Sequence, residues 1–319
     1  MLALYFDGQP KIHDLPRPEP GSGEVLVRVS IAGICGTDLQ ILRGYHNFRG
    51  IMGHEFVGEV VGPQDSPWLG QRVVGEINIG CGECHLCHRG LARHCRKRQV
   101  LGIKDHAGAF AQYLTIPTAN LHLVPPEVSN EMAVFTEPLA AALRVVETAS
   151  ISSEDRILVI GDGSLGLQIS WVLALNGVQV YLVGHYEDHL ALARPYGVET
   201  FLVKDLPAGD FKVVVEASGS PAGLELALSR VRPLGTVILK STYIDRYPLD
   251  PATVVVPEVH LVGSRCGPFP PALRLLRRGW VDPRPLINQT FPLNQGLKAL
   301  ARAQRPGVLK VLLDCRESD

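Results

Sequence analysis

The sequence predicts an α/β protein in two parts, in which a parallel sheet with helices on both faces follows a β-rich, turn-rich region. Three observations lead to this prediction: the length, a change of patterning after Pro125-Pro126, and a regular alternation of strand-like and helix-like runs beyond it. The chain has 319 residues, which at roughly 150 residues per domain is enough for about two domains.

The part before Pro125 reads as strands and turns. It contains short runs rich in Val and Ile, punctuated by Gly and Pro, with the alternation typical of half-buried strands. These runs cover 24–34, 55–62, 72–76 and 109–116.

Beyond Pro126 the chain becomes rich in Ala, Leu and Glu. The segment 131–149 reads as helix, and Pro138, which lacks an N–H, is expected near the start of a new helix. The runs that follow are strand 156–160, helix 165–175, strand 178–183, helix 187–196, strand 212–217, helix 221–231, and strands 236–240 and 259–263. Such alternation predicts a parallel sheet. A proline-rich linker at 267–271 and a strand at 308–313 follow.

Composition argues against several classes of partner. The chain is 46% hydrophobic and 20% charged, and 31 Lys and Arg balance 32 Asp and Glu, which gives no general attraction to nucleic acid or anionic membranes. No apolar run approaches the roughly 18 residues that cross a bilayer, and the first residues lack the apolar stretch of a signal peptide. We therefore expect a cytoplasmic protein with no nucleic-acid or membrane partner.

Four of the seven cysteines form a cluster with metal-ligand spacing, Cys81-x2-Cys84-x2-Cys87-x7-Cys95. Four thiolates can surround one Zn²⁺ tetrahedrally, and a shell closed in this way is structural. An iron–sulfur site and free thiols are the alternatives. The neighbouring histidines, which four sulfurs make unnecessary as ligands, are expected to face solvent; they are His85, His88 and His94. Cys266 and Cys315 have no partner spacing and no predicted role.

A second candidate metal site lies upstream. Cys35 and His54 each stand at the end of a strand-like run, where two strand ends can converge on one point. A thiolate, an imidazole and a carboxylate make a three-ligand zinc site whose fourth position stays open for water or an alcohol.

The segment GDGSLG, residues 161–166, predicts dinucleotide binding. Gly161, Gly163 and Gly166 stand between an apolar strand and an apolar helix, with further strand–helix alternation downstream. In this context the glycines allow a tight turn, and the backbone at Ser164 and Leu165 can meet a pyrophosphate at the helix N-terminus. The alternating part is therefore predicted to be a Rossmann domain.

The choice of cofactor depends on the end of the second strand of that domain. NAD-binding enzymes place Asp or Glu there to hold the ribose hydroxyls. Here the strand ends at Val183 and is followed by Gly184, His185 and Tyr186, which are expected to line the adenosine phosphate region. Because no carboxylate stands at this position to repel a 2′-phosphate, NADP(H) is predicted over NAD(H).

The motifs as a set resemble a known family. GHEFVGEVVG (53–62), CGTD (35–38), the four-cysteine cluster, TEPLAA (136–141) and the strand–GDGSLG–helix unit occur in the order found in zinc-dependent medium-chain alcohol and polyol dehydrogenases. Glu55 after His54 and the sequence Glu137-Pro138-Leu139 resemble the sorbitol, threonine and secondary-alcohol branches. The resemblance implies a GroES-like catalytic domain (1–144 and 267–319) with both zinc sites, and an inserted Rossmann domain (145–266).

The resemblance also implies metal ligands. Cys35 and His54 would bind a catalytic zinc, and Glu55 and Glu137 are both candidates for the remaining carboxylate ligand or for a place just outside the ligands. One structural zinc would be bound by the four-cysteine cluster.

The resemblance further implies that Thr37 places its hydroxyl against the substrate oxygen and helps to remove its proton. Where related enzymes often have a histidine, five residues after the cysteine ligand, this chain has Gln40, which cannot take up a proton at neutral pH. The proton relay would then end in water or in another group such as His46, although His46 is more easily read as a surface residue.

The predicted activity is reversible hydride transfer between an alcohol (secondary alcohol, polyol or sugar) and NAD(P)⁺. The expected partners are a small alcohol or carbonyl substrate and further copies of the chain, as a homodimer or homotetramer. The alternative is a zinc-stabilised NAD(P)-binding protein with a non-catalytic or regulatory role.

Overall fold

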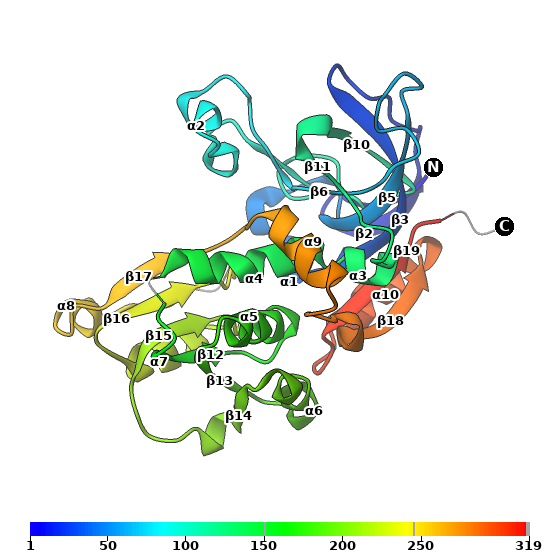
Figure 1. The fold of residues 1–319 in the computed structure, drawn as a ribbon. Helices are drawn as coiled ribbons and strands as arrows, with labels where there is room; N and C mark the ends of the chain where they lie inside the picture. Colours follow the sequence, from blue (N-terminus) through cyan, green and yellow to red (C-terminus); the bar gives the residue numbers. More distant parts are fainter. Residues whose placement is uncertain (150, 245, 317–319) are drawn as a thin grey trace. The chain divides into compact units, whose positions relative to one another are not determined.

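The computed structural model describes residues 1–149, 151–244 and 246–316, and the chain forms two compact units (Figure 1). Unit 1 is Met1–Glu137 with Ala272–Asp319, and unit 2 is Pro138–Pro271. The predicted domains, 1–144 with 267–319 and 145–266, stay predictions. The predicted boundary between residues 144 and 145 falls inside one helix, α4 (Thr136–Thr148).

The main sheet of unit 1 is built around β3 (Glu24–Ile34). Its strand order is β11 (Leu121–Leu123), β6 (Arg72–Gly75), β5 (Glu55–Gly62), β3, β19 (Lys310–Asp314) and β18 (Ile287–Pro292), and β10 (Tyr113–Pro117) pairs with β3. Antiparallel pairing of Val311 with Ile34 joins β19 to β3. A strand from late in the sequence thus lies beside the first long strand, and both are largely buried.

Two smaller sheets complete the β structure of unit 1. One has the order β2 (Pro10–Asp14), β1 (Leu2–Phe6), β4 (Gly50–Ile51), and the other β7 (Asn78–Ile79), β8 (Gln99–Leu101), β9 (Asp105–His106). The α-helices of this unit are short: α1 (Gly36–Leu42), α2 (His85–His88), α3 (Asn130–Ala133) and α10 (Gly296–Ala303). The cysteine cluster lies between β7 and β8, outside the main sheet.

Unit 2 contains the predicted parallel sheet. Its strand order is β14 (Glu199–Leu202), β13 (Gln179–Gly184), β12 (Arg156–Ile160), β15 (Phe211–Glu216), β16 (Val231–Leu239) and β17 (His260–Gly263). Every neighbouring pair is parallel. Numbered along the chain this is 3-2-1-4-5-6, the order of two joined mononucleotide-binding halves. The central strands are almost continuously apolar because helices cover both faces.

Unit 2 contains α4 from Pro138 onward, together with α5 (Ser164–Leu175), α6 (Glu187–Ala191), α7 (Pro221–Arg230) and α8 (Ala252–Val255). Two expectations were wrong. The helix predicted over 187–196 ends at Ala191, and a 3₁₀ turn follows in which Pro195 has no N–H to continue an α-helix. The predicted linker at 267–271 contains the start of α9 (Phe269–Arg277), since prolines are tolerated in a first helical turn.

The segment predicted as helix over 131–149 divides into α3 and α4, and Pro138 lies in the first turn of α4 as expected. With 13 residues, α4 is the longest of the described helices. Within the described ranges, no helix has the length and apolar character needed to cross a membrane.

Candidate functional site

Two neighbouring strand ends of unit 1 bring three potential metal ligands together. Cys35 follows β3 and precedes α1, and His54 directly precedes β5. Gly33 of β3 pairs with Glu55 of β5, so the end of one strand lies beside the start of the other. One ligand atom each of Cys35, His54 and Glu55 lies within 4.8 Å of the others. The expected convergence of two strand ends at this point is confirmed.

The Glu55 carboxylate is buried with one oxygen paired and one not. Its Oε2 accepts a hydrogen bond from the Lys310 ammonium group at 2.6 Å, whereas its buried Oε1 has no hydrogen-bond partner among the described residues. Gly33 makes room for this carboxylate, because a Cβ there would lie 2.4 Å from Oε2. A buried anionic oxygen without a partner is costly, and a divalent cation held with Cys35 and His54 would remove that cost.

Lys310 supplies a buried positive charge. Its side chain is 4% exposed and its Nζ lies 5.6 Å from the centre of the Phe135 ring. Burial alone would lower the pKa of Lys310, but the charge of Glu55 outweighs burial and raises the pKa above its usual value. The ammonium group therefore stays charged and balances one carboxylate. Sequence reasoning missed this residue, although a lysine at the start of an apolar strand was a usable signal.

Asp38 lies beside the imidazole of His54, without a well-formed hydrogen bond between them. One carboxylate oxygen of Asp38 accepts the backbone N–H of Cys35 at 2.8 Å, and the other lies 3.3 Å from His54 Nδ1. Because Nδ1 faces Asp38, Nε2 is left to bind a metal. Burial alone would lower the pKa of His54, but Asp38 reverses the shift and raises it well above its usual value. Asp38 was also missed; it is fully buried in the first turn of α1.

The other residues assigned to this site differ in position. Thr37 is half-buried in the first turn of α1, two residues after Cys35. Gln40 has a buried Oε1 without a hydrogen-bond partner in the described part of the chain. His46 is exposed, as expected of a surface histidine. Glu137 lies in the first turn of α4 and is not one of the three grouped ligands. The catalytic roles of these four residues stay predictions.

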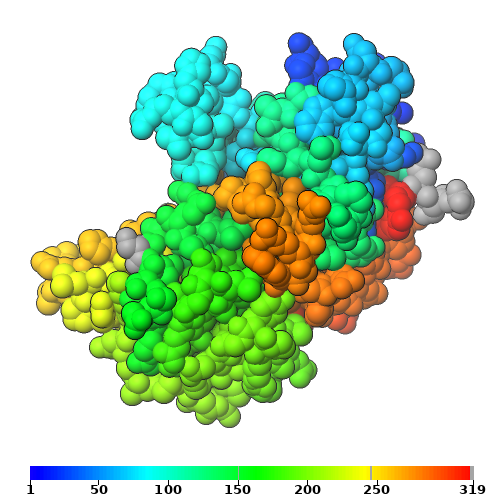
Figure 2. All heavy atoms as spheres, viewed as in Figure 1, coloured from blue at the N-terminus to red at the C-terminus, as the bar shows by residue number. Residues whose placement is uncertain are grey.

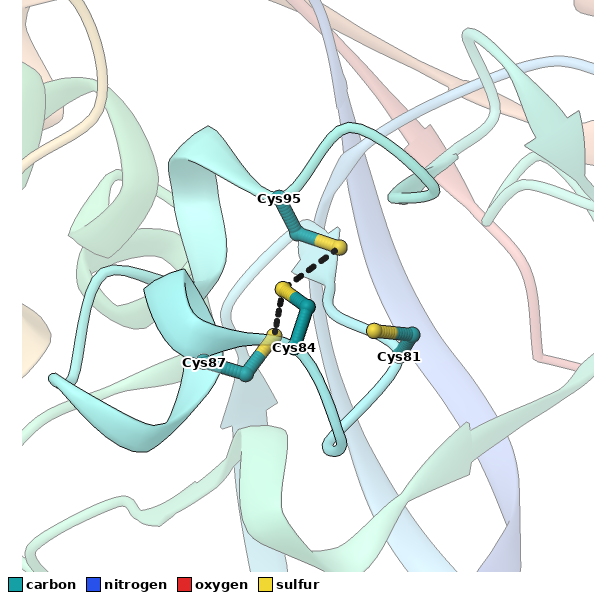
Figure 3. A group of neighbouring side chains, drawn as sticks. All are labelled: Cys81, Cys84, Cys87 and Cys95. Carbon is teal, nitrogen blue, oxygen red and sulfur yellow. Dashed lines mark hydrogen bonds between the residues drawn. The ribbon is translucent and has the colours of Figure 1, made fainter.

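The four-cysteine cluster forms a second ligand group (Figure 3). Cys84 Sγ lies 3.6 Å from Cys87 Sγ and 3.8 Å from Cys95 Sγ. Four sulfurs about 2.3 Å from one tetrahedral Zn²⁺ would lie about 3.8 Å apart, so the described positions fit that ion. His85, His88 and His94 are exposed and outside the group, as expected.

The cluster sits in a protruding part of unit 1 (cyan in Figure 2). Backbone N–H groups help to stabilise thiolates there: that of Cys87 lowers the pKa of Cys84, and that of Cys81 lowers the pKa of Cys95. Metal binding needs the thiolate form, which the backbone favours at Cys84 and Cys95, whereas burial raises the pKa of Cys87 to about 11.

The glycine loop of unit 2 has the geometry that a dinucleotide needs. Gly161 has a φ of +113°, and a Cβ there would lie 2.6 Å from the carbonyl oxygen of Ala217. A Cβ at Gly166 would lie 1.9 Å from the oxygen of Gly161, whereas one at Gly163 would meet nothing within 4 Å. The first and third glycines are required by packing, and the space at the second, which caps α5, suits a pyrophosphate.

The end of β13 differs from the sequence prediction. Gly184, His185 and Tyr186 occupy the expected position, but a carboxylate is present there after all. The Asp162 side chain, from the glycine loop, accepts the backbone N–H groups of His185 and Tyr186 at 2.9 and 2.7 Å. The premise of the NADP(H) prediction was therefore wrong, because a residue 22 positions earlier in the chain, Asp162, supplies the negative charge.

Comparison with known proteins places these sites in a family. Residues 21–126 match the model of the alcohol dehydrogenase GroES-like domain. Over 325 residues the chain is 30% identical to the erythritol/L-threitol dehydrogenase of Mycolicibacterium smegmatis, covering 91% of this chain and 90% of the relative. The chain belongs to the zinc-type medium-chain alcohol and polyol dehydrogenases. The GroES-like and Rossmann assignments of this dehydrogenase are thereby confirmed.

Solved structures extend the comparison to the whole chain. The structure of RspB from Escherichia coli CFT073, complexed with NADH, has a TM-score of 0.89, 26% identity and coverage of 98% and 99% of the two chains. A candidate zinc-binding dehydrogenase from Sinorhizobium meliloti 1021, bound to NADP, has a TM-score of 0.87, 26% identity and coverage of 98% of each chain. This dehydrogenase is accordingly an NAD(P)-dependent oxidoreductase of the alcohol and polyol class, and its neighbours include complexes with both cofactors.

Proposed function

We propose that this dehydrogenase transfers hydride reversibly between a secondary alcohol, polyol or sugar and NAD(P)⁺. The observation that carries the proposal is the unpartnered, buried Oε1 of Glu55 beside Cys35 and His54. A thiolate, an imidazole and a carboxylate are suitable zinc ligands and leave one position for the substrate oxygen. The erythritol/L-threitol dehydrogenase in the same family supports a polyol as the substrate.

When bound by Cys35, His54 and Glu55, zinc would supply Lewis acidity at the substrate oxygen, and a bound nicotinamide would supply the hydride acceptor or donor. The protein's own residues orient the metal ligands and balance their charge. Asp38 faces the ring of His54, and Lys310 balances the charge of Glu55. Thr37 accepts the alcohol proton and passes it on. Since the amide of Gln40 can only hydrogen-bond, the proton leaves through water, and Glu137 remains a candidate ligand.

The cofactor is held by the glycine loop. Gly161 and Gly166 set the turn, and the backbone at Gly163, Ser164 and Leu165 meets the pyrophosphate. The adenosine end lies at Gly184, His185 and Tyr186. The preference for NADP(H) stays a prediction, and the Asp162 carboxylate removes its basis.

A substrate panel tests the proposal. The purified protein, assayed for zinc content, would be given tetritols, pentitols, hexitols, aldoses and simple secondary alcohols with NAD⁺ or NADP⁺, and absorbance at 340 nm would be followed. We expect two zinc ions per chain and turnover of at least one polyol. Fully zinc-loaded protein that binds a nicotinamide cofactor but turns over no alcohol on the panel would contradict the proposal.

No turnover together with only one zinc ion per chain would favour the alternative, a zinc-stabilised NAD(P)-binding protein with a non-catalytic or regulatory role. Gln40 is the observation that favours this alternative, because it replaces a proton-accepting side chain with one that cannot take a proton. The two functions also differ in metal content, since the alternative needs only the four-cysteine zinc.

We also propose that the dehydrogenase forms homodimers or homotetramers. The strand β17 pairs with β16 alone within the described residues, and three large apolar side chains nearby are exposed: Leu234, Val255 and Val256, at 65%, 70% and 80%. In Figures 1 and 2, α8 lies on the surface of unit 2. Light scattering of the protein and of Val255→Lys would test this assembly. The cytoplasmic location stays a prediction.

A further inference from the structure

The Asp162 carboxylate occupies an unusual place in unit 2. Asp162 is the second residue of the glycine loop, and it is 6% exposed. Its Oδ2 lies at the carboxyl end of the neighbouring strand β13. There it accepts two hydrogen bonds, from the backbone N–H of His185 at 2.9 Å and of Tyr186 at 2.7 Å. Its main-chain oxygen lies 3.0 Å from His189 Nδ1. Two adjacent backbone N–H groups thus hold the side chain at the end of β13.

Gly184, the last residue of β13, leaves the space that the Asp162 side chain occupies. A Cβ at position 184 would lie 2.2 Å from Cγ of Asp162 and 2.5 Å from its Oδ2. An acidic side chain at the end of the strand would therefore begin where the Asp162 carboxyl group already lies. The two positions exclude each other sterically, so this chain places one carboxylate at the site and delivers it from the glycine loop.

This location bears on the adenosine ribose. In dinucleotide-binding folds an acidic residue at the end of the second strand binds the ribose hydroxyls, whereas a 2′-phosphate needs positive charge. Backbone N–H groups are good anion donors, but those of His185 and Tyr186 are already used by Asp162. A 2′-phosphate could use these N–H groups only by displacing the Asp162 carboxylate from them. Even then, the negative charge of Asp162 would stay close to the phosphate and repel it.

The charges around the turn are also unfavourable to a phosphate. The first turn of α6 adds two exposed carboxylates, Glu187 and Asp188. The basic side chain nearest in sequence after the histidines, Arg194, is paired with Glu187 and donates from Nε to Thr200 at 3.0 Å. The arginine is thus held by other groups rather than offered to a ligand.

We propose that Asp162 determines cofactor specificity and makes this dehydrogenase prefer NAD(H) to NADP(H). The proposal rests on the proposed function only in assuming that unit 2 binds a nicotinamide dinucleotide. It replaces the NADP(H) preference predicted from Gly184, because the missing acidic residue is supplied by Asp162.

Direct binding provides the test, without substrate or turnover. Titration of the protein with NADH and with NADPH, followed by nicotinamide fluorescence, gives two dissociation constants. We expect NADH to bind at least about tenfold more tightly. In Asp162→Asn, whose amide oxygen still accepts from the backbone, the ratio should fall at least about fivefold through tighter NADPH binding. The matched control Asp210→Asn removes an exposed charge just before β15, away from the carboxyl end of β13, and should change the ratio less than about twofold.

A relocation of the charge gives an independent check. Gly184→Asp alone should weaken binding of both cofactors, because its Cβ meets the Asp162 carboxyl group. The double variant Asp162→Ala with Gly184→Asp removes that clash and returns a carboxylate to the site, so it should bind NADH more tightly than NADPH again. A merely structural role for Asp162 would lower the affinity for both cofactors equally and leave their ratio unchanged.

The outcomes separate the two proposals. Wild-type protein that prefers NADPH, or an Asp162→Asn ratio equal to that of the wild type, would overturn the specificity role of Asp162 and leave the dehydrogenase assignment intact. Binding of neither dinucleotide to folded, zinc-loaded protein would overturn the proposed function itself.

Discussion

The two metal-ligand groups of unit 1 use cysteine in opposite ways. The four-cysteine group comes from a single stretch of fifteen residues in a protruding loop, and its members are ligands of one kind. The group of Cys35, His54 and Glu55 combines three kinds of donor on two strand ends, with support from α1 and β19. One site is local and closed, whereas the other is assembled by the tertiary fold and left incomplete.

The surroundings of the two groups differ in how charge is balanced. Four thiolates exceed the charge of one Zn²⁺, and in the exposed loop this excess can be offset by solvent and by nearby basic residues such as Arg96 and Lys97. In the assembled site His54 and Glu55 are buried, and Lys310 provides the balancing charge at 2.6 Å from Glu55. A buried ion pair is costly to break, so the assembled site should be the more sensitive to single substitutions.

The largest effect on turnover is expected from Cys35→Ser. Loss of the thiolate should lower kcat/KM by more than about 10³-fold and reduce the zinc content from two ions to one per chain. NADH binding in the same variant should change little, because the glycine loop lies in unit 2. Activity retained after metal removal would contradict the zinc mechanism.

A smaller loss is expected from Asp38→Asn. The amide would still accept the Cys35 N–H but would offer a donor to His54 Nδ1, which favours the tautomer with a proton on the metal-binding nitrogen. Zinc affinity at this site should fall about 10- to 100-fold, and added zinc should partly restore activity. Asp65→Asn, an exposed change in the same unit, should leave zinc affinity unaltered. Equal losses in both variants would rule out this positioning role.

Lys310→Met should reduce turnover less than Asp38→Asn but should destabilise unit 1. It leaves the Glu55 carboxylate buried without its cation, at a cost of about 3–5 kcal/mol in the free energy of unfolding. Urea unfolding would measure this loss. Adding Glu55→Gln removes the uncompensated charge, so the double variant should be more stable than Lys310→Met alone; additive losses would show that the two side chains are not coupled.

The smallest effect on turnover is expected from Cys84→Ser in the four-cysteine group. This variant should lose the structural zinc and lower Tm by on the order of 10 °C, while kcat at 25 °C changes less than about threefold. His88→Ala, which alters an exposed neighbour outside the ligand group, should keep two zinc ions per chain. Loss of zinc from His88→Ala would show that His88 is a ligand. The four-cysteine group would then not be a closed shell of four thiolates.

The same contrast explains what the sequence could and could not predict. The four-cysteine group, the glycine loop and the alternation of unit 2 are local patterns, and the structure brings their residues together as expected. Cys35 and His54 were found because strand ends can meet. Lys310 was missed because its partner, Glu55, is 255 residues away in sequence, and no spacing rule joins them.

Asp162 shows a related limit. Reading the strand end position by position finds Gly184 and no acidic residue, whereas the adjacent loop in space provides the carboxylate. A pattern that assigns one role to one position fails when a side chain from a neighbouring loop takes that role. The proline-rich segment at 267–271 failed for a different reason, because prolines that suit a linker also suit the first turn of α9.

The position of β19 has a consequence for biosynthesis. The strand that carries Lys310 is made after all of unit 2, so β3 and Glu55 emerge from the ribosome long before their partner. At about 5–20 residues per second the 255 residues between Glu55 and Lys310 take roughly 10 to 50 s to synthesise. Unit 2 is an uninterrupted segment and can fold during that interval, while the nascent unit 1 holds a carboxylate that has no cation to pair with. We therefore expect early capture of zinc by Cys35 and His54 to protect this intermediate, so that added zinc during expression would raise the yield of folded protein.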